Sequence, residues 1–253
     1  MNLPQRIDFI INAFKWPAAF IALLATPLVC WSLIPLAARV AQSPWPLVPF
    51  AAGAAAFLII WRRWLGKSRL GQFAITLEHE STHALFAALC CHRIVGFRAT
   101  LESGGEVRYV GQGNWLITAA PYFFPTAALI LFLLAYLLPF PGLPWRSFLL
   151  GVALAYHFVS TYRETHRDQL DLKQLGSLFC WMFLPAANLA AVGLLVSFAH
   201  DGTSGMSTWF SETARPIYWL SEELHSLTAE QTSSESEPHG PHGGANVEST
   251  YQN

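Results

Sequence analysis

Charged residues are scarce in this sequence of 253 residues. Asp, Glu, Lys and Arg make up 12% of it, about half of the roughly 25% that is typical of soluble domains. The charges are also unevenly spread, because four stretches contain none of them: 16–38, 40–61, 109–145 and 174–200. Each stretch is at least as long as the about 20 residues that a helix needs to span a bilayer. The sequence therefore predicts a polytopic membrane protein.

Two further scarcities exclude other classes of protein. The net charge is −1 and the basic residues form no stripe, so the sequence has no electrostatic footprint for nucleic acid and we expect no such partner. There are only four cysteines, all in or beside apolar segments, where a free thiol packs as a small hydrophobic group. They are Cys30, Cys90, Cys91 and Cys180, and they do not form the framework of a disulfide-rich secreted protein.

The apolar segments predict an all-α bundle of about six transmembrane helices, embedded in a lipid bilayer. The expected spans are about 16–38, 45–61, 71–91, 115–139, 146–162 and 174–199.

A polar stretch, 92–114, separates the third and fourth expected spans. It contains Gly104–Gly105 followed by alternating polar and apolar residues, which predicts a small polar hairpin. Near the carboxyl terminus the sequence becomes rich in Ser, Glu, Gly and Pro. We therefore expect a transmembrane domain over 1–227 and a disordered polar tail over 228–253.

The third expected span contains the motif H-E-x-x-H, formed by His79, Glu80 and His83. On a helix, residues four apart lie on the same face, so the two imidazoles can bind one metal ion. The glutamate then stands beside the metal, where a carboxylate can accept a proton from a metal-bound water. Ionisable groups inside an apolar segment are costly. The motif therefore favours a catalytic zinc site over a chance polar patch.

A catalytic zinc usually has a third protein ligand, and the densest polar cluster outside the motif lies at 163–172. If the chain is helical from residue 157, one face of that helix carries four polar residues: His157, Glu164, Asp168 and Asp171. Such a face can line a polar cavity. The alternative is a loop with ordinary surface charges.

These features together resemble the site-2 protease family of intramembrane zinc metalloproteases, and more narrowly its compact bacterial branch without a PDZ domain. The resemblance extends over about 70–190. Its sharpest anchors are Glu-His-Glu-Ser-Thr-His-Ala at 78–84 and Gln-Leu-Asp-Leu-Lys-Gln-Leu-Gly at 169–176, and a weaker one is Ala-Ala-Pro-Tyr-Phe-Phe-Pro at 119–125.

The resemblance implies that Zn²⁺ is bound by His79, His83 and Asp171, with Glu80 as the catalytic general base. Asp168, one turn earlier, is the reserve candidate for the third ligand. The sequence differs from better-known members, in which the aspartate belongs to an Asp-Gly pair, because Leu172 follows Asp171 here. The resemblance also implies an integral protein of the bacterial inner (cytoplasmic) membrane.

The leading hypothesis is a zinc-dependent intramembrane endopeptidase that cleaves membrane-protein substrates through a zinc-activated water, with Glu80 as general base. Two alternatives use the same residues. One is a membrane zinc hydrolase acting on a lipid-linked or small amide substrate. The other is a non-catalytic metal-binding membrane partner.

Overall fold

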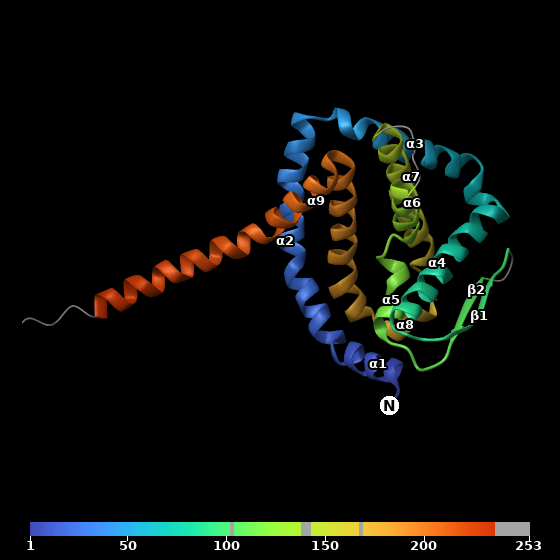
Figure 1. The fold of residues 1–253 in the computed structure, drawn as a ribbon, viewed down its shortest axis with the longest axis horizontal. Coiled ribbons are helices and arrows are strands. Elements are labelled where there is room, and N and C mark those ends of the chain that lie inside the picture. The colour runs from blue at the N-terminus through green and yellow to red at the C-terminus, as the bar shows by residue number, and fades with distance from the viewer. Residues whose placement is uncertain (102–103, 138–142, 167–168, 236–253) are drawn as a thin grey trace, which may run out of the picture. The chain divides into compact units, whose positions relative to one another are not determined.

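The computed structural model describes residues 1–101, 104–137, 143–166 and 169–235, and it is almost entirely helical (Figure 1). A single antiparallel strand pair interrupts the helices in the described part of the chain, so the predicted all-α fold with a small hairpin is confirmed. The elements in chain order are α1 (Leu3–Ala13), α2 (Lys15–Gln42), η1 (Trp45–Leu47), α3 (Val48–Arg63), η2 (Leu65–Lys67), α4 (Arg69–Leu89), β1 (Ile94–Ala99), β2 (Gly105–Tyr109), α5 (Trp115–Ala119), η3 (Ala120–Tyr122), α6 (Thr126–Leu137), α7 (Leu143–Glu164), α8 (Leu170–Leu175) and α9 (Ser177–Glu235).

Three helices in the described part of the chain are long and apolar enough to cross a membrane: Lys15–Gln42, Trp45–Arg63 and Ser177–Thr228. The expected count of six spans is therefore not confirmed. Instead of one long helix, the fourth expected segment forms α5, η3 and α6, because Pro121 and Pro125 interrupt its helical hydrogen bonds.

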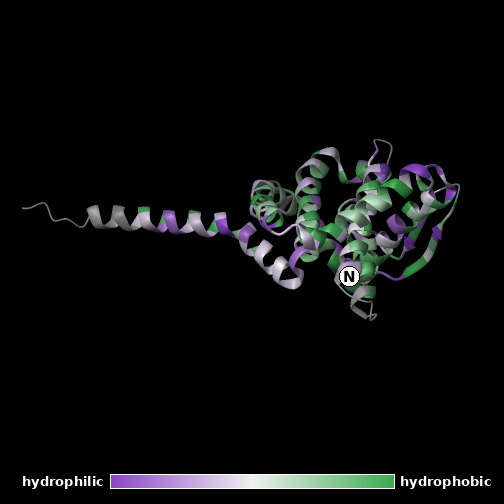
Figure 2. Ribbon diagram, turned by 90° about the horizontal axis from the view of Figure 1, so that it is seen from above, coloured by the Kyte–Doolittle hydropathy of each residue, from purple (hydrophilic) through white to green (hydrophobic). Residues whose placement is uncertain are grey.

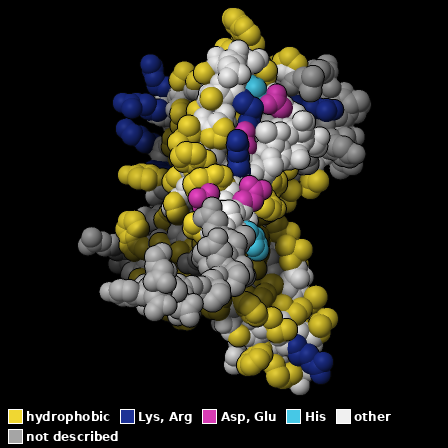
Figure 3. Space-filling view, turned by 90° about the vertical axis from the view of Figure 1, so that its left-hand side faces the viewer, with side chains coloured by type: hydrophobic (Ala, Val, Ile, Leu, Met, Phe, Trp, Pro, Cys, Tyr) yellow, Lys and Arg dark blue, Asp and Glu magenta, His cyan; other side chains and the backbone are white. Residues whose placement is uncertain are grey.

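Large apolar side chains are exposed on many of the described helices. Figure 2 shows hydrophobic residues along these helices, and Figure 3 shows apolar side chains over much of the face in view. Extensive exposed apolar surface is unusual in a soluble monomer. It is expected of helices that contact lipid.

The chain divides into two compact units, Met1–Thr213 and Ala214–Asn253. The described part of the second unit is the helical end of α9, which extends to Glu235. The expected disordered tail, 228–253, overlaps this helix as far as Glu235, and residues 236–253 lie outside the described part of the chain.

Helix α9 contains a break at Gly202. The backbone there has φ 64° and ψ −143°, a conformation that glycine adopts readily. Beyond the break the chain packs back on itself, so that Trp209 lies against Gly193. Trp209 also packs with Val29 and Leu36 of α2 in one apolar cluster.

The hairpin lies beside the helix that carries the motif. Strands β1 and β2 pair in antiparallel register, with Gly96 opposite Arg108 and Ala99 opposite Gly105. Both strands contact α4 and lie along one side of it (Figure 1). The hairpin and α5 therefore both pack against α4.

Helices α3 and α7 pack at very close range because each presents a glycine to the other. A Cβ atom added at Gly53 would overlap the carbonyl group of Phe148 on α7, and one added at Gly151 would overlap the carbonyl group of Phe50 on α3. Small residues at a helix crossing allow this close backbone approach in membrane proteins. The backbones of α3 and α7 are therefore tightly packed at this crossing.

We expect Gly53→Leu and Gly151→Leu to separate α3 from α7 and to lower the thermal unfolding temperature of the protein in detergent. The displaced atoms are backbone atoms, which cannot move aside as a side chain would, so overpacking should cost about 1–3 kcal/mol or more. The matched control is Ala51→Leu at an exposed position of α3. Unfolding temperatures equal to wild type in both glycine variants would contradict the close packing.

Candidate active site

The H-E-x-x-H motif lies in the second half of α4. This helix begins at a Ser68 cap, whose hydroxyl oxygen accepts a hydrogen bond from the backbone N–H of Gly71 at 3.0 Å. One helical turn separates His79 and His83, so their rings project from the same face and their centroids are 4.8 Å apart. Both rings are largely shielded from solvent, with side-chain exposures of 5% and 13%.

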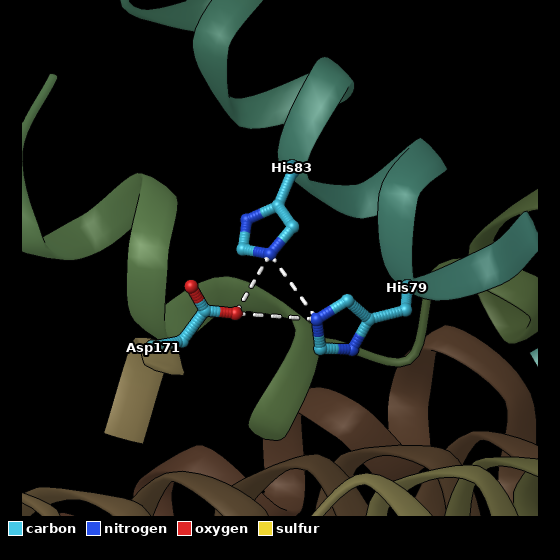
Figure 4. A group of neighbouring side chains, drawn as sticks. All are labelled: His79, His83 and Asp171. Carbon is cyan, nitrogen blue, oxygen red and sulfur yellow. Dashed lines mark hydrogen bonds and ion pairs between the residues drawn. The ribbon is translucent and has the colours of Figure 1, made fainter. Parts of the chain in front are cut away.

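The structure brings Asp171 of the short helix α8 to these two histidines (Figure 4). Its Oδ2 atom lies 3.3 Å from Nε2 of His79 and 3.2 Å from Nε2 of His83, and the two nitrogens are 3.2 Å apart. Donor atoms at the corners of a tetrahedron around zinc, with bonds of about 2.0–2.1 Å, are about 3.3 Å from one another. The spacing and the types of these three donors therefore fit one zinc ion.

The tautomer of His83 is set by a backbone carbonyl group. Its Nδ1 atom lies 2.9 Å from the carbonyl oxygen of Ile117 in α5. A carbonyl oxygen only accepts hydrogen bonds, so Nδ1 carries the proton, and in the neutral ring the lone pair of Nε2 points toward Asp171 and His79. A second partner of this kind is the usual means of orienting a metal-binding histidine.

Asp171 also contacts Tyr122, a fully buried residue of η3. The phenol O–H of Tyr122 donates to Oδ2 of Asp171 at 3.3 Å. Burial alone would raise the pKa of Asp171, but hydrogen bonds from the protonated rings of His79 and His83 outweigh this effect, so the pKa lies below its ordinary value. Asp171 is therefore ionised at neutral pH, the form in which a carboxylate binds a cation. In the neutral rings the nitrogens that face Asp171 carry lone pairs and can bind a cation instead.

Glu80 shares a cavity of about 470 Å³ with the three donor residues. Strand β2 forms a wall of this cavity, and Gly105 packs directly against the Glu80 side chain: a Cβ atom at position 105 would lie 2.7 Å from Oε1 of Glu80. The rest of the lining is largely polar and includes Gln169 and Gln174. The arrangement places a carboxylate, a set of metal donors and room for a small polar segment in one space.

Not all of the predicted cluster at 163–172 joins the site. Helix α7 ends at Glu164 and α8 begins at Leu170, so the single helical face expected from His157 to Asp171 does not exist. His157 lies within hydrogen-bonding distance of Asn188, with 3.4 Å between Nε2 and Oδ1. The reserve candidate Asp168 lies outside the described residues.

Asn188 contacts the backbone of Tyr122, the residue whose phenol group reaches Asp171. Its side-chain amide donates to the Tyr122 carbonyl oxygen at 2.9 Å and to the Leu184 carbonyl oxygen at 3.0 Å. The first half of α9 thereby holds η3 in place. The Pro121–Pro125 element that contributes to the family resemblance includes Tyr122, so a sequence signal for this contact existed.

Glu78 faces away from the three donors. Its Oε1 atom accepts a hydrogen bond from the backbone N–H of Ala127 at 3.3 Å, in the first turn of α6. The carboxylate therefore caps a neighbouring helix. The roles of Gly105 and of the Ile117 carbonyl group, by contrast, depend on contacts through space that leave no pattern in the sequence.

Comparison with known proteins gives a match to one family model. Residues 50–166 match the family model described as Peptidase M50B-like. The matched region contains the whole motif and the hairpin, and it ends before Asp171. Searches of curated proteins and of solved structures found no match. The family-model match, which covers somewhat less than half of the chain, and the apolar helices together support an integral membrane metallopeptidase of the site-2 protease type.

Proposed function

We propose that this metallopeptidase is a zinc-dependent intramembrane endopeptidase that cleaves membrane-embedded protein substrates. The observation that carries the proposal is the convergence of His79, His83 and Asp171, with donor atoms 3.2–3.3 Å apart, in the same cavity as Glu80. Two imidazole nitrogens and one carboxylate oxygen are typical ligands of a catalytic zinc, and three protein ligands leave a coordination position for water or substrate.

Each ligand would present a defined atom to the metal: Nε2 of His79, Nε2 of His83 and Oδ2 of Asp171. When bound, zinc would polarise the scissile carbonyl group and lower the pKa of a water molecule to about 7. The hydrogen bond from His83 to Ile117 and the one from Tyr122 to Asp171 would hold these ligands in place before the metal arrives.

Glu80 would carry the proton transfers. It follows His79 directly on α4, and its carboxylate reaches the cavity that the ligands share. We expect it to accept the proton of the attacking water and to donate it to the nitrogen of the leaving amine. The backbone of Gly105 limits where the carboxylate can lie and keeps it near the ligands.

The proposed substrate is a segment of a membrane protein, and the proposed location is a bacterial inner membrane. Peptide bonds inside a bilayer are shielded from water, so their hydrolysis needs a polar cavity within an apolar body. The cavity beside Glu80 is mostly polar, whereas the described helices expose many large apolar side chains. This combination supports a membrane-embedded substrate more than a soluble one.

We predict that Glu80→Gln abolishes cleavage while zinc stays bound. Loss of general acid–base catalysis should reduce kcat by about 10²–10⁴-fold, measured with the purified protein and a transmembrane reporter peptide in lipid bilayers. The matched control is Glu78→Gln, which keeps the oxygen that accepts the Ala127 N–H, and it should be close to wild type. Undiminished cleavage by Glu80→Gln would exclude Glu80 as the base, and hydrolysis of a lipid-linked amide but of no peptide would contradict the endopeptidase.

We predict that His83→Ala and Asp171→Ala each remove most of the zinc from the purified protein, measured by elemental analysis against about one ion per chain in wild type. Asp201→Ala, on α9, is the control for loss of a carboxylate and should retain zinc. Asp168→Ala should also retain it. If Asp171→Ala retains zinc and Asp168→Ala loses it, the third ligand is Asp168. If both variants retain zinc, the third ligand is another residue.

We predict that Gly105→Ala lowers kcat by about tenfold or more, because its Cβ would displace the carboxylate of Glu80. Zinc content should not change. Gly96→Ala in the paired strand is the matched control, since its Cβ would lie at an ordinary 3.5 Å from Cβ of Arg108. Wild-type turnover by Gly105→Ala would mean that Glu80 does not need the position in which the strand holds it.

A further inference from the structure

Helix α1 reverses the usual relation between polarity and burial. Asp8 is the one residue of this helix that is buried, with 6% of its surface exposed. Leu3, Phe9 and Ile10 of the same helix are largely exposed. Burial of a carboxylate is costly unless charge-assisted hydrogen bonds compensate it. The hydrogen-bond partners of Asp8 therefore show which elements this residue connects to α1.

The first partner is His92, which lies between the end of α4 and the start of β1. Nε2 of His92 is 2.9 Å from Oδ1 of Asp8, and Nδ1 of His92 is 2.8 Å from the carbonyl oxygen of Val110, directly after β2. The ring of His92 is fully buried and packs against the Tyr109 ring, with 5.0 Å between centroids. Asp8 thus holds the open end of the hairpin whose other end, at Gly105, packs on Glu80.

The second partner is Asn114, the cap residue of α5. Its Oδ1 atom accepts the backbone N–H groups of Leu116 and Ile117 at 3.1 and 3.2 Å. The amide orientation is fixed by these two donors, so Nδ2 faces Asp8 and donates to Oδ1 at 2.7 Å. Helix α5 is the helix whose Ile117 carbonyl group orients His83.

We infer that Asp8 is a positioning residue of the active site. It joins α1 to strand β2, which packs on Glu80, and to helix α5, which orients His83. The inference rests on the proposed function for its catalytic consequence. One arm runs through His92 to β2, and the other runs through Asn114 to α5.

These polar groups fix the orientation of α1 relative to its partners rather than add stability. A buried cluster of polar side chains seldom adds net stability compared with apolar side chains of similar volume. Apolar side chains already surround the cluster, since Ile7 and Ile11 of α1 pack against the core that contains Cys90 and Ile117. Apolar packing permits small rotations, whereas charge-assisted hydrogen bonds at 2.7–2.9 Å fix the angle of each partner.

The two arms predict different results for three substitutions in the full-length protein in lipid bilayers. Asp8→Asn should increase amide hydrogen exchange about tenfold in both 105–110 and 115–119, raise the zinc dissociation constant about tenfold and lower kcat about tenfold. His92→Gln should increase exchange in 105–110 alone and leave zinc affinity unchanged. Asn114→Ala should increase exchange in 115–119 and weaken zinc binding.

The control is Asp201→Asn, which alters another His–Asp pair, the one between His200 and Asp201 of α9, and should change none of these quantities. Unchanged exchange in both segments of Asp8→Asn, or an equal increase across α3 and α7, would overturn the inference. If Asp8→Asn does not fold, the separate patterns of His92→Gln and Asn114→Ala decide, and identical patterns in the two would overturn it. Hydrogen exchange does not require peptidase activity, so failure of the proposed function would be distinguishable from failure of this inference.

Discussion

Two imidazole nitrogens and one carboxylate oxygen lie within 3.3 Å of one another, although 88 residues separate His83 from Asp171 in the chain. Lone pairs at such distances repel one another unless a proton or a cation lies between them. Until a proton or a cation lies between them, holding these atoms together costs free energy. The surrounding structure must hold these groups together, and many of its local features serve this requirement.

The elements that hold the site are the irregular ones. Helix α5 is only five residues long, η3 is three residues long, and the hairpin has a register shift between Ile94 and Gly96. Irregular backbone at membrane depth is tolerated where it is buried in protein or lines a polar cavity. These elements do both, because α5 gives its Ile117 carbonyl group to His83, η3 places Tyr122 on Asp171, and β2 places Gly105 on Glu80. The regular helices α3 and α7, by contrast, pack closely on each other through their glycines.

Features with a local period could be predicted from the sequence, and features that depend on contacts through space could not. His79, Glu80 and His83 lie within one and a half helical turns, so the spacing alone predicts a shared site. Asp171 could be assigned only through the family resemblance, because the helical face drawn from His157 ends with α7 at Glu164. The hydropathy pattern predicts six apolar segments, but it does not show that prolines divide the fourth of them into three short elements. Gly105 shows no sign in the sequence of its contact with Glu80.

The same limit applies to Asp8. A single carboxylate in an amino-terminal helix with other polar residues looks like an ordinary solvated charge, and only the structure reveals that it is buried while Phe9 and Ile10 beside it are exposed. Where the exterior is apolar, burial of a side chain in the protein is no longer driven mainly by its own hydrophobicity, so directional polar contacts have more influence on how elements pack. Asp8, His92 and Asn114 form such contacts, and so do His157 and Asn188. These buried polar contacts join elements that also form the site, which couples local packing directly to the chemistry.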